Sequence, residues 1–303
     1  MAIYPNIYQT LQPGPVVELR GYLGACGRRG RLYAYLDYGG PTGTARDALA
    51  EGMLALALAR GALTPGQPIV EAVSGPFATA LTLAGQTAGH PVVLVMPEDA
   101  PAMRQESLLR LGAQILHTPA QAGFAGARAE AEAKAAEKGW FYLNWLNNDD
   151  NPACHRRVTG PALVQAIARP QGASLVDSIV MGVGSGGTIT GVGETVKGWT
   201  NDVRIVAVEP YESQALSHGL TGPHGIPDMG FGVVPGNYNA YVVDNIVAVT
   251  TADAQRAAQR VLRTDAIPAA VSAGAALHAA AQLIAKGTSR SALAVFSARQ
   301  SIL

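Results

Sequence analysis

The sequence predicts an α/β protein built from two doubly wound lobes. Apolar runs typical of strands alternate with apolar residues at helical spacing along nearly the whole chain. This alternation favours parallel strands, because a crossover between parallel strands needs a connection long enough for a helix. There is no internal repeat and no low-complexity linker, and 303 residues can bury a core without disulfide or metal support.

The first series of elements extends over residues 31–146. "QPIVEAV" (67–73) and "HPVVLVMPE" (90–98) are short apolar runs, whereas "ARDALAEGMLALALARGAL" (45–63) has its apolar residues at helical spacing. We expect strands at 31–38, 67–73, 90–98, 114–118 and 140–146, and helices at 45–63, 78–89, 101–113 and 123–138.

The second series begins near residue 152 and includes a loop-rich stretch at 211–240. We expect strands at 174–183, 204–210, 245–250 and 292–297, and helices at 154–168, 190–198, 251–264 and 272–286. The predicted smaller lobe is 38–151, and the larger lobe is 1–37 plus 152–303. Ligands are expected where strand carboxyl ends meet helix amino ends.

Composition excludes several classes of protein. The formal net charge is zero, so there is no basic field to attract nucleic acid or an anionic membrane. Cys26 and Cys154 are too few for a disulfide framework or a cysteine metal site, and the histidines lack the spacing of metal ligands. No secretion signal and no membrane-spanning run is visible, so we expect a cytoplasmic protein without a metal.

The stretch "MGVGSGGTITGVG" (181–193) follows a strand and opens a helix. Gly184, Ser185, Gly186, Gly187 and Thr188 are expected to form an anion-binding cup, because glycines allow close approach and the first amides of a helix are free donors. The stretch lacks the Gly-Lys-Ser/Thr ending of a nucleotide P-loop and the acidic residue of the dinucleotide fingerprint. A glycine-rich turn without a ligand remains the alternative.

Several motifs resemble the cysteine synthase and cystathionine β-synthase family. They include "GVGSGGTITGVGETVK", "NPACHRRVTGPALVQ" and "AVSAGAALHAA" (270–280), and the similarity covers nearly the whole chain. These are fold type II enzymes, similar to the tryptophan synthase β chain, that depend on pyridoxal 5′-phosphate (PLP). The resemblance implies that the cup binds the PLP phosphate and that Ser272 contacts the pyridine nitrogen.

Position 46 departs from the family pattern. In "GPTGTARD", Arg46 stands where the resemblance places the lysine that forms the Schiff base with PLP. A guanidinium has no free lone pair, so it neither forms an imine nor takes the α-proton of a substrate. The other lysines of the chain offer no substitute; they are Lys134, Lys138, Lys197 and Lys286.

A second departure concerns the loop that holds the substrate carboxylate in the family. Here it reads "VSGPFAT", with Ser74, Gly75, Pro76 and Phe77. Pro76 replaces an asparagine and has no backbone N–H, and Trp145 replaces a glutamine. We expect these five residues to line the cleft and fill it in part with apolar groups. Ordinary core packing of Phe77 and Trp145 is the alternative.

These departures predict a pseudoenzyme of the cysteine synthase type, with no catalytic residue and no covalently bound cofactor. Weak non-covalent PLP or phosphate binding is expected at the cup. The resemblance also implies a homodimer and a protein partner that binds through the cleft. The alternatives are a diverged enzyme that uses the cup without a Schiff base, and a PLP-dependent β-replacement enzyme or lyase. Gly186→Asp is expected to abolish anion binding and leave the fold intact.

Overall fold

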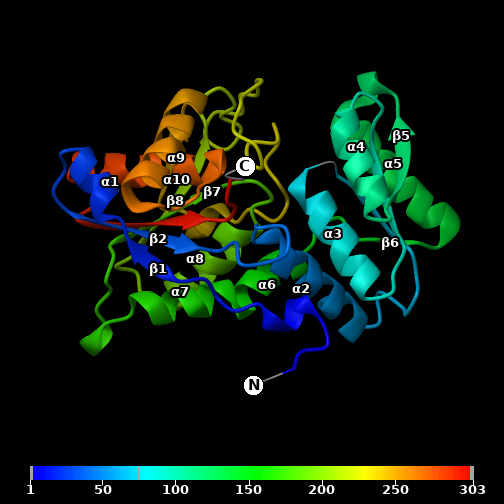
Figure 1. Cartoon of the computed structure of the whole chain (residues 1–303), viewed down its shortest axis with the longest axis horizontal. Helices are drawn as coiled ribbons and strands as arrows, with labels where there is room; N and C mark the ends of the chain where they lie inside the picture. Colours follow the sequence, from blue (N-terminus) through cyan, green and yellow to red (C-terminus); the bar gives the residue numbers. More distant parts are fainter. Residues whose placement is uncertain (1–2, 74, 301–303) are drawn as a thin grey trace. The chain divides into compact units, whose positions relative to one another are not determined.

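The computed structural model describes residues 3–73 and 75–300 (Figure 1). The chain forms two compact units. One contains Gly40–Asp150 and the segment before Gln12, and the other contains Gln12–Gly39 and the chain from Asn151 onward. The N-terminal segment therefore belongs with the smaller unit and not, as expected, with the larger one. The reason is the 3₁₀ helix η1 (Ile7–Thr10), which contacts helix α2 and contains the buried Tyr8.

The larger unit is built on a six-stranded sheet with the order β1-β2-β10-β7-β8-β9. Strand β1 pairs with β2 in the antiparallel sense, and all other neighbours are parallel. The strands are β1 (Val16–Glu18), β2 (Arg31–Leu36), β7 (Ser178–Gly182), β8 (Arg204–Pro210), β9 (Asn245–Val249) and β10 (Ser291–Phe296).

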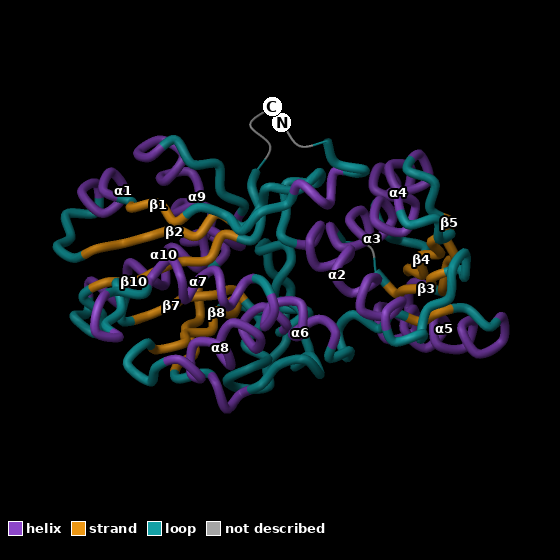
Figure 2. Tube along the Cα trace, turned by 90° about the horizontal axis from the view of Figure 1, so that it is seen from below, coloured by secondary structure: helices purple, strands orange, loops and turns teal. Residues whose placement is uncertain are grey.

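Helices cover both faces of this sheet (Figures 1 and 2). One face packs on α9 and α10 and the other on α7 and α8, and each face has its own apolar core. The elements are α1 (Arg20–Ala25), α6 (Asp150–Arg157), α7 (Thr159–Ile167), α8 (Gly187–Trp199), α9 (Thr251–Asp265), α10 (Val271–Ala285), η3 (Pro170–Gly172) and η4 (Ala240–Val242).

The smaller unit contains a four-stranded parallel sheet with the order β5-β4-β3-β6. Helix α5 covers one face, and α3, which packs on α2, covers the other (Figure 2). The elements are β3 (Ile69–Ala72), β4 (Val92–Pro97), β5 (Gln114–Thr118), β6 (Phe141–Tyr142), α2 (Arg46–Ala59), α3 (Pro76–Thr87), α4 (Ala102–Arg110), η2 (Ala120–Ala122) and α5 (Gly123–Lys138).

The predicted α/β fold class is confirmed, with some local differences, one being that the strand expected at 140–146 is only β6, Phe141–Tyr142. Strand β1 and helix α1 were not anticipated, because they are too short to show periodicity. The helix expected at 154–168 is two helices, since Val158 has φ −123° and ψ −66°, outside the helical region. That helical segment also begins at Asp150, four residues before the predicted start.

The order of the six-stranded sheet places its switch point at β7. From β7 the chain moves outward to β8 and β9, and α10 then returns it to β10 on the other side of β7. Ligands of such sheets bind beyond the carboxyl ends of the strands at this point. Among the described residues, no helix is long and apolar enough to cross a membrane.

Candidate functional site

The glycine loop connects β7 to α8 at the switch point. Gly186 has φ +80°, in the left-handed region that favours glycine. Gly184 lies so close to the chain that a Cβ there would sit 2.3 Å from the carbonyl oxygen of Asp228. The first N–H groups of α8 have no partner four residues earlier in the helix, and that of Gly187 donates only a long bond of 3.4 Å to the Oγ of Ser185, so the start of the helix suits an anion. The structure therefore has a loop of the geometry expected for an anion cup.

The same geometry corrects the expected effect of Gly186→Asp. A Cβ at this position would lie 2.9 Å from the backbone nitrogen and Cα of Tyr238. The substitution would thus strain the backbone twice, through the positive φ and through this contact. It would not leave the fold intact, so it is a poor test of anion binding.

Two side chains of α6 support the loop, and sequence reasoning missed both. Asn151 is fully buried, and its Nδ2 donates to the Oγ of Ser185 at 3.1 Å. The Nε2 of His155 lies 3.1 Å from the Oγ1 of Thr188, and its Nδ1 lies 2.9 Å from the Oγ1 of Thr159. Burial lowers the pKa of His155 to about 4, so the ring is neutral near pH 7. The four-residue spacing of Asn151 and His155 on one helix face was the available signal.

Ser272 lies in the first turn of α10, next to the end of β7. Its carbonyl oxygen is 3.8 Å from where a Cβ of Gly182 would sit. The side chain is buried, and among the described residues its Oγ has no hydrogen-bond partner. A buried hydroxyl without a partner costs free energy, so it marks a place where a ligand atom is expected.

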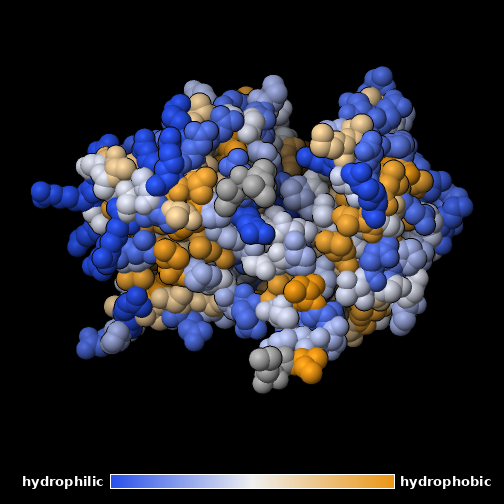
Figure 3. Space-filling view, in the orientation of Figure 1, coloured by the Kyte–Doolittle hydropathy of each residue, from blue (hydrophilic) through white to orange (hydrophobic). Residues whose placement is uncertain are grey.

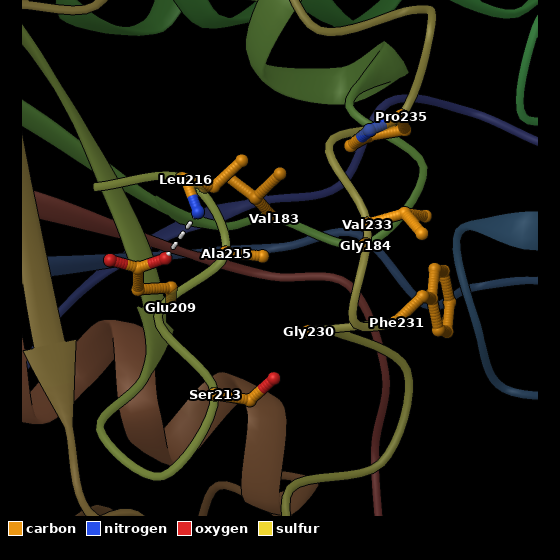
Figure 4. Close-up of a pocket in the computed structure, with 10 residues that line it drawn as sticks. All are labelled: Val183, Gly184, Glu209, Ser213, Ala215, Leu216, Gly230, Phe231, Val233 and Pro235. Carbon is orange, nitrogen blue, oxygen red and sulfur yellow. Dashed lines mark hydrogen bonds between the residues drawn. The ribbon is translucent and has the colours of Figure 1, made fainter. Parts of the chain in front are cut away.

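Gly184 also lines a small pocket with Glu209, Ser213 and Phe231 (Figure 4). The carboxylate of Glu209 accepts a hydrogen bond from the backbone N–H of Leu216 at 2.8 Å. The buried hydroxyl of Ser213 points into the pocket and has no partner among the described residues. The volume of about 10 Å³ corresponds to one water molecule, so this pocket is too small for a substrate.

Arg46 is the first residue of α2, in the smaller unit. Its backbone N–H donates to the Oγ1 of Thr44 at 3.3 Å, its Nη1 is buried, and the residue as a whole is half-buried. The neighbouring Asp47 is fully buried and accepts hydrogen bonds from the N–H and the hydroxyl of Thr42, both at 2.9 Å. Asp47 therefore closes the turn before α2, and burial raises its pKa.

The predicted cleft residues lie around the amino end of α3. Gly75 caps this helix and Pro76 begins it, whereas Ser74 lies outside the described residues. Phe77 and Trp145 are stacked, with ring centroids 4.3 Å apart and planes 11° apart. They are 1% and 6% exposed, so their contact belongs to the interior of the smaller unit.

A buried carboxylate holds Trp145 in place, and it too was missed from the sequence. Glu71 is 1% exposed, and its Oε2 accepts the backbone N–H of Trp145 at 2.9 Å. Its Oε1 accepts the N–H of Ala72 at 2.9 Å. Burial raises the pKa of Glu71 to about 8 despite these bonds.

The four lysines lie elsewhere. Lys134 and Lys138 form ion pairs with Glu137 on α5. Lys197 pairs with Asp244. Lys197 is ten residues beyond the start of α8 and thus about 15 Å along that helix. Lys286 follows the last residue of α10, at the opposite end from Ser272. The residues predicted to bind an anion, in the loop and at Ser272, belong to the larger unit. Arg46 and the residues predicted to line the cleft belong to the smaller unit.

Comparison with known proteins assigns the class. A sequence model described as pyridoxal-phosphate dependent enzyme matches residues 7–297, so the chain belongs to this family. Within it, the chain is 34% identical over 277 residues to a cysteine synthase of Staphylococcus aureus, a match that covers 91% of this chain and 87% of the relative.

Solved structures of cysteine synthases and of a related synthase have the same fold as this chain. A cysteine synthase of Entamoeba histolytica gives a TM-score of 0.89 at 31% identity, covering 98% of this chain and 88% of that one. O-ureido-L-serine synthase gives a TM-score of 0.89 at 28% identity, covering 98% and 92%. The chain is therefore a cysteine synthase-like member of the PLP-dependent enzymes, which confirms the predicted family and fold.

Family membership corrects one expectation. The sequence led us to expect no covalently bound cofactor, with weak non-covalent PLP or phosphate at most. That expectation is wrong for this family, whose members are PLP-dependent enzymes and include cysteine synthases. It rested on the residue at one position, whereas the family match extends over nearly the whole chain.

The described residues fit two parts of PLP. The amides at the start of α8 suit the phosphate, and the buried, partnerless hydroxyl of Ser272 suits the pyridine nitrogen. When bound, PLP supplies an electron sink for reactions at the α-carbon of amino acids. These are the two points at which residues of this chain would hold the group.

Proposed function

We propose that this chain is a cysteine synthase-like pseudoenzyme, which binds an anionic ligand at the glycine loop and no longer catalyses β-replacement. The ligand class is a phosphate monoester. The protein has kept the geometry that holds such a group and has lost groups that act on an amino-acid substrate.

The observation that carries the proposal is Arg46 at the amino end of α2. The resemblance places the family's lysine there, and in the family that amine moves the substrate α-proton. A guanidinium stays protonated and cannot accept this proton. Three of the four amines that could replace the family's lysine are engaged in ion pairs, those of Lys134, Lys138 and Lys197.

The start of α3 supports the proposal from the same unit. Pro76 has no N–H to offer a carboxylate, and Phe77 and Trp145 bury their rings against each other. A substrate carboxylate would lose hydrogen-bond donors at this turn. Restoring only an amine at position 46 would leave that loss in place.

The test is turnover of O-acetylserine with sulfide in the presence of added PLP. We expect no turnover above the uncatalysed rate for wild type and for Arg46→Lys. Turnover by wild type would refute the pseudoenzyme. Turnover by Arg46→Lys alone would show instead that the α3 turn does not hold the substrate.

Ligand binding is tested separately, through the melting temperature as a function of phosphate or PLP concentration. Thr188→Asp places a carboxylate at the cup, where the start of α8 tolerates an acidic side chain. We expect the rise in melting temperature to be markedly smaller in Thr188→Asp than in wild type and to persist unchanged in the control Thr188→Ser. No rise in wild type would leave the loop as a turn without a ligand.

A β-replacement enzyme is the second candidate, because the relatives at 34% and 31% identity are cysteine synthases. A diverged enzyme that binds its substrate at the cup is the third. The turnover assay separates the first candidate from the second. An activity on a phosphorylated compound that Thr188→Asp abolishes would identify the third.

The proposal includes a homodimer and a protein partner for the same site, as the family resemblance suggests. Light scattering at micromolar concentration measures the molar mass and so tests the dimer. A monomeric mass would exclude the homodimer. Competition between phosphate and a captured partner tests whether both use the cup.

A further inference from the structure

A second pocket lies in the larger unit, at the amino end of β2. Its walls come from the end of β1, from α1 and from the turn before β2, and its volume is about 210 Å³. Arg20, Arg28 and Arg31 line it, together with Glu18. This arginine pocket shares no residue with the glycine loop or with Ser272.

The charge of the arginine pocket is unbalanced. The guanidinium of Arg20 pairs with Glu18 at 2.7 Å. Within the ranges that the structure describes, Arg28 and Arg31 form no ion pair, and both are exposed. Two positive charges therefore remain uncompensated around one concave surface, on a chain whose formal net charge is zero. Figure 3 shows strongly hydrophilic side chains over the end of this unit where α1 lies.

The backbone that carries these arginines is fixed by hydrogen bonds and packing. The N–H of Leu19 donates to the carbonyl of Leu32 at 2.8 Å, and the N–H of Arg28 donates to the carbonyl of Leu23 at 3.2 Å. Gly30 has φ +141°, and a Cβ there would lie 2.7 Å from the Cγ2 of Ile284. The turn is thus anchored on α10, so the backbone that carries the arginines is ordered before a ligand binds.

We propose that the arginine pocket binds a small phosphorylated molecule. Guanidinium groups bind phosphate with two parallel hydrogen bonds, and two uncompensated charges match a phosphate dianion. The concave shape favours a small molecule. A nucleic acid would need an extended basic surface, which a chain of zero net charge does not provide.

This site is separate from the cup. The arginine pocket lies at the amino end of β2, whereas the cup follows the carboxyl end of β7, and both strands run parallel in one sheet through β10. Six residues of β2 correspond to about 20 Å along the strand. One phosphorylated molecule of small size cannot occupy both sites.

The experiment is calorimetric titration of the full chain with inorganic pyrophosphate at low ionic strength. We expect Arg28→Gln combined with Arg31→Gln to weaken binding at least tenfold. The matched control removes two exposed arginines of the same unit, Arg169→Gln with Arg263→Gln, and should stay within about twofold of wild type. Thr188→Asp should leave this binding in place, because it alters only the cup.

Three results would overturn the proposal. They are no pyrophosphate binding by wild type, equal loss in the control pair, and loss in Thr188→Asp with none in the Arg28 and Arg31 pair. An oligonucleotide or an acidic peptide serves as the competing probe. If either binds more tightly than pyrophosphate and loses that binding in the double variant, the surface recognises a macromolecule and the proposal fails.

Discussion

The β7–α8 loop and the β3–α3 turn stand at equivalent places in their two sheets, after a buried parallel strand and before a helix. Around the first, small residues and hydroxyl groups are held by Asn151 and His155. Around the second, Phe77 and Trp145 fill the space with stacked rings. The chemistry of the β7–α8 loop depends on its backbone conformation, which few substitutions preserve. The chemistry of the β3–α3 turn depends on side-chain identity, so single substitutions can change it and leave the strand and the helix in place.

The largest effect is expected when the ring contact between Phe77 and Trp145 is removed. Phe77→Ala should lower the free energy of unfolding by about 3–5 kcal/mol, because Phe77 is fully buried and a cavity would remain beside Trp145. Urea unfolding measures this change. The control is Phe124→Ala, on α5 of the same unit and 38% exposed, with an expected loss below about 1 kcal/mol. Equal losses would mean that the stack contributes nothing specific.

The two regions should respond to pH in opposite directions. The pKa of His155 falls from 6.5 to about 4 in the folded protein, so its contribution to stability is present above pH 6.5 and is lost as the pH falls toward 4. The pKa of Glu71 rises from 4.5 to about 8, so its contribution is present below pH 4.5 and is lost as the pH rises toward 8. Each effect is on the order of 3 kcal/mol or more.

Because these windows overlap, variants are needed to separate the two contributions. His155→Gln should flatten the loss of stability on acidification, and Glu71→Gln should flatten the loss on the alkaline side. The free energy of unfolding at several pH values between 4 and 8 provides the measurement. An unchanged pH dependence in either variant would show that the substituted residue does not cause the corresponding loss of stability.

The smallest effect concerns the backbone of the loop. Gly184→Ala should destabilise by about 1–3 kcal/mol, because the new Cβ would meet the carbonyl oxygen of Asp228 at 2.3 Å. Gly198→Ala, near the end of α8, meets nothing within 4 Å and should stabilise by about 0.5–1 kcal/mol. Melting temperatures of the two variants should shift in opposite directions. A neutral Gly184→Ala would show that the loop tolerates a shift of its neighbour.

Local pattern was sufficient for much of the fold. The buried strands β3, β4, β7 and β8 and the long helices were predictable, because periodicity is a property of neighbouring residues. The glycine loop was predictable for the same reason. The break at Val158 and the short elements β1 and α1 were not, since their conformations depend on packing against the rest of the unit.

The sequence by itself determined the α/β class, the glycine loop, the identity of Arg46 and the apolar replacements at Pro76, Phe77 and Trp145. Only the tertiary structure brought Asn151 and His155 to the loop, attached Trp145 to Glu71, and gathered Arg20, Arg28 and Arg31 around one pocket. The physical reason is that hydrogen bonds, burial and charge depend on distances in space. Residues 74 positions apart, such as Glu71 and Trp145, become neighbours only when strands pack side by side.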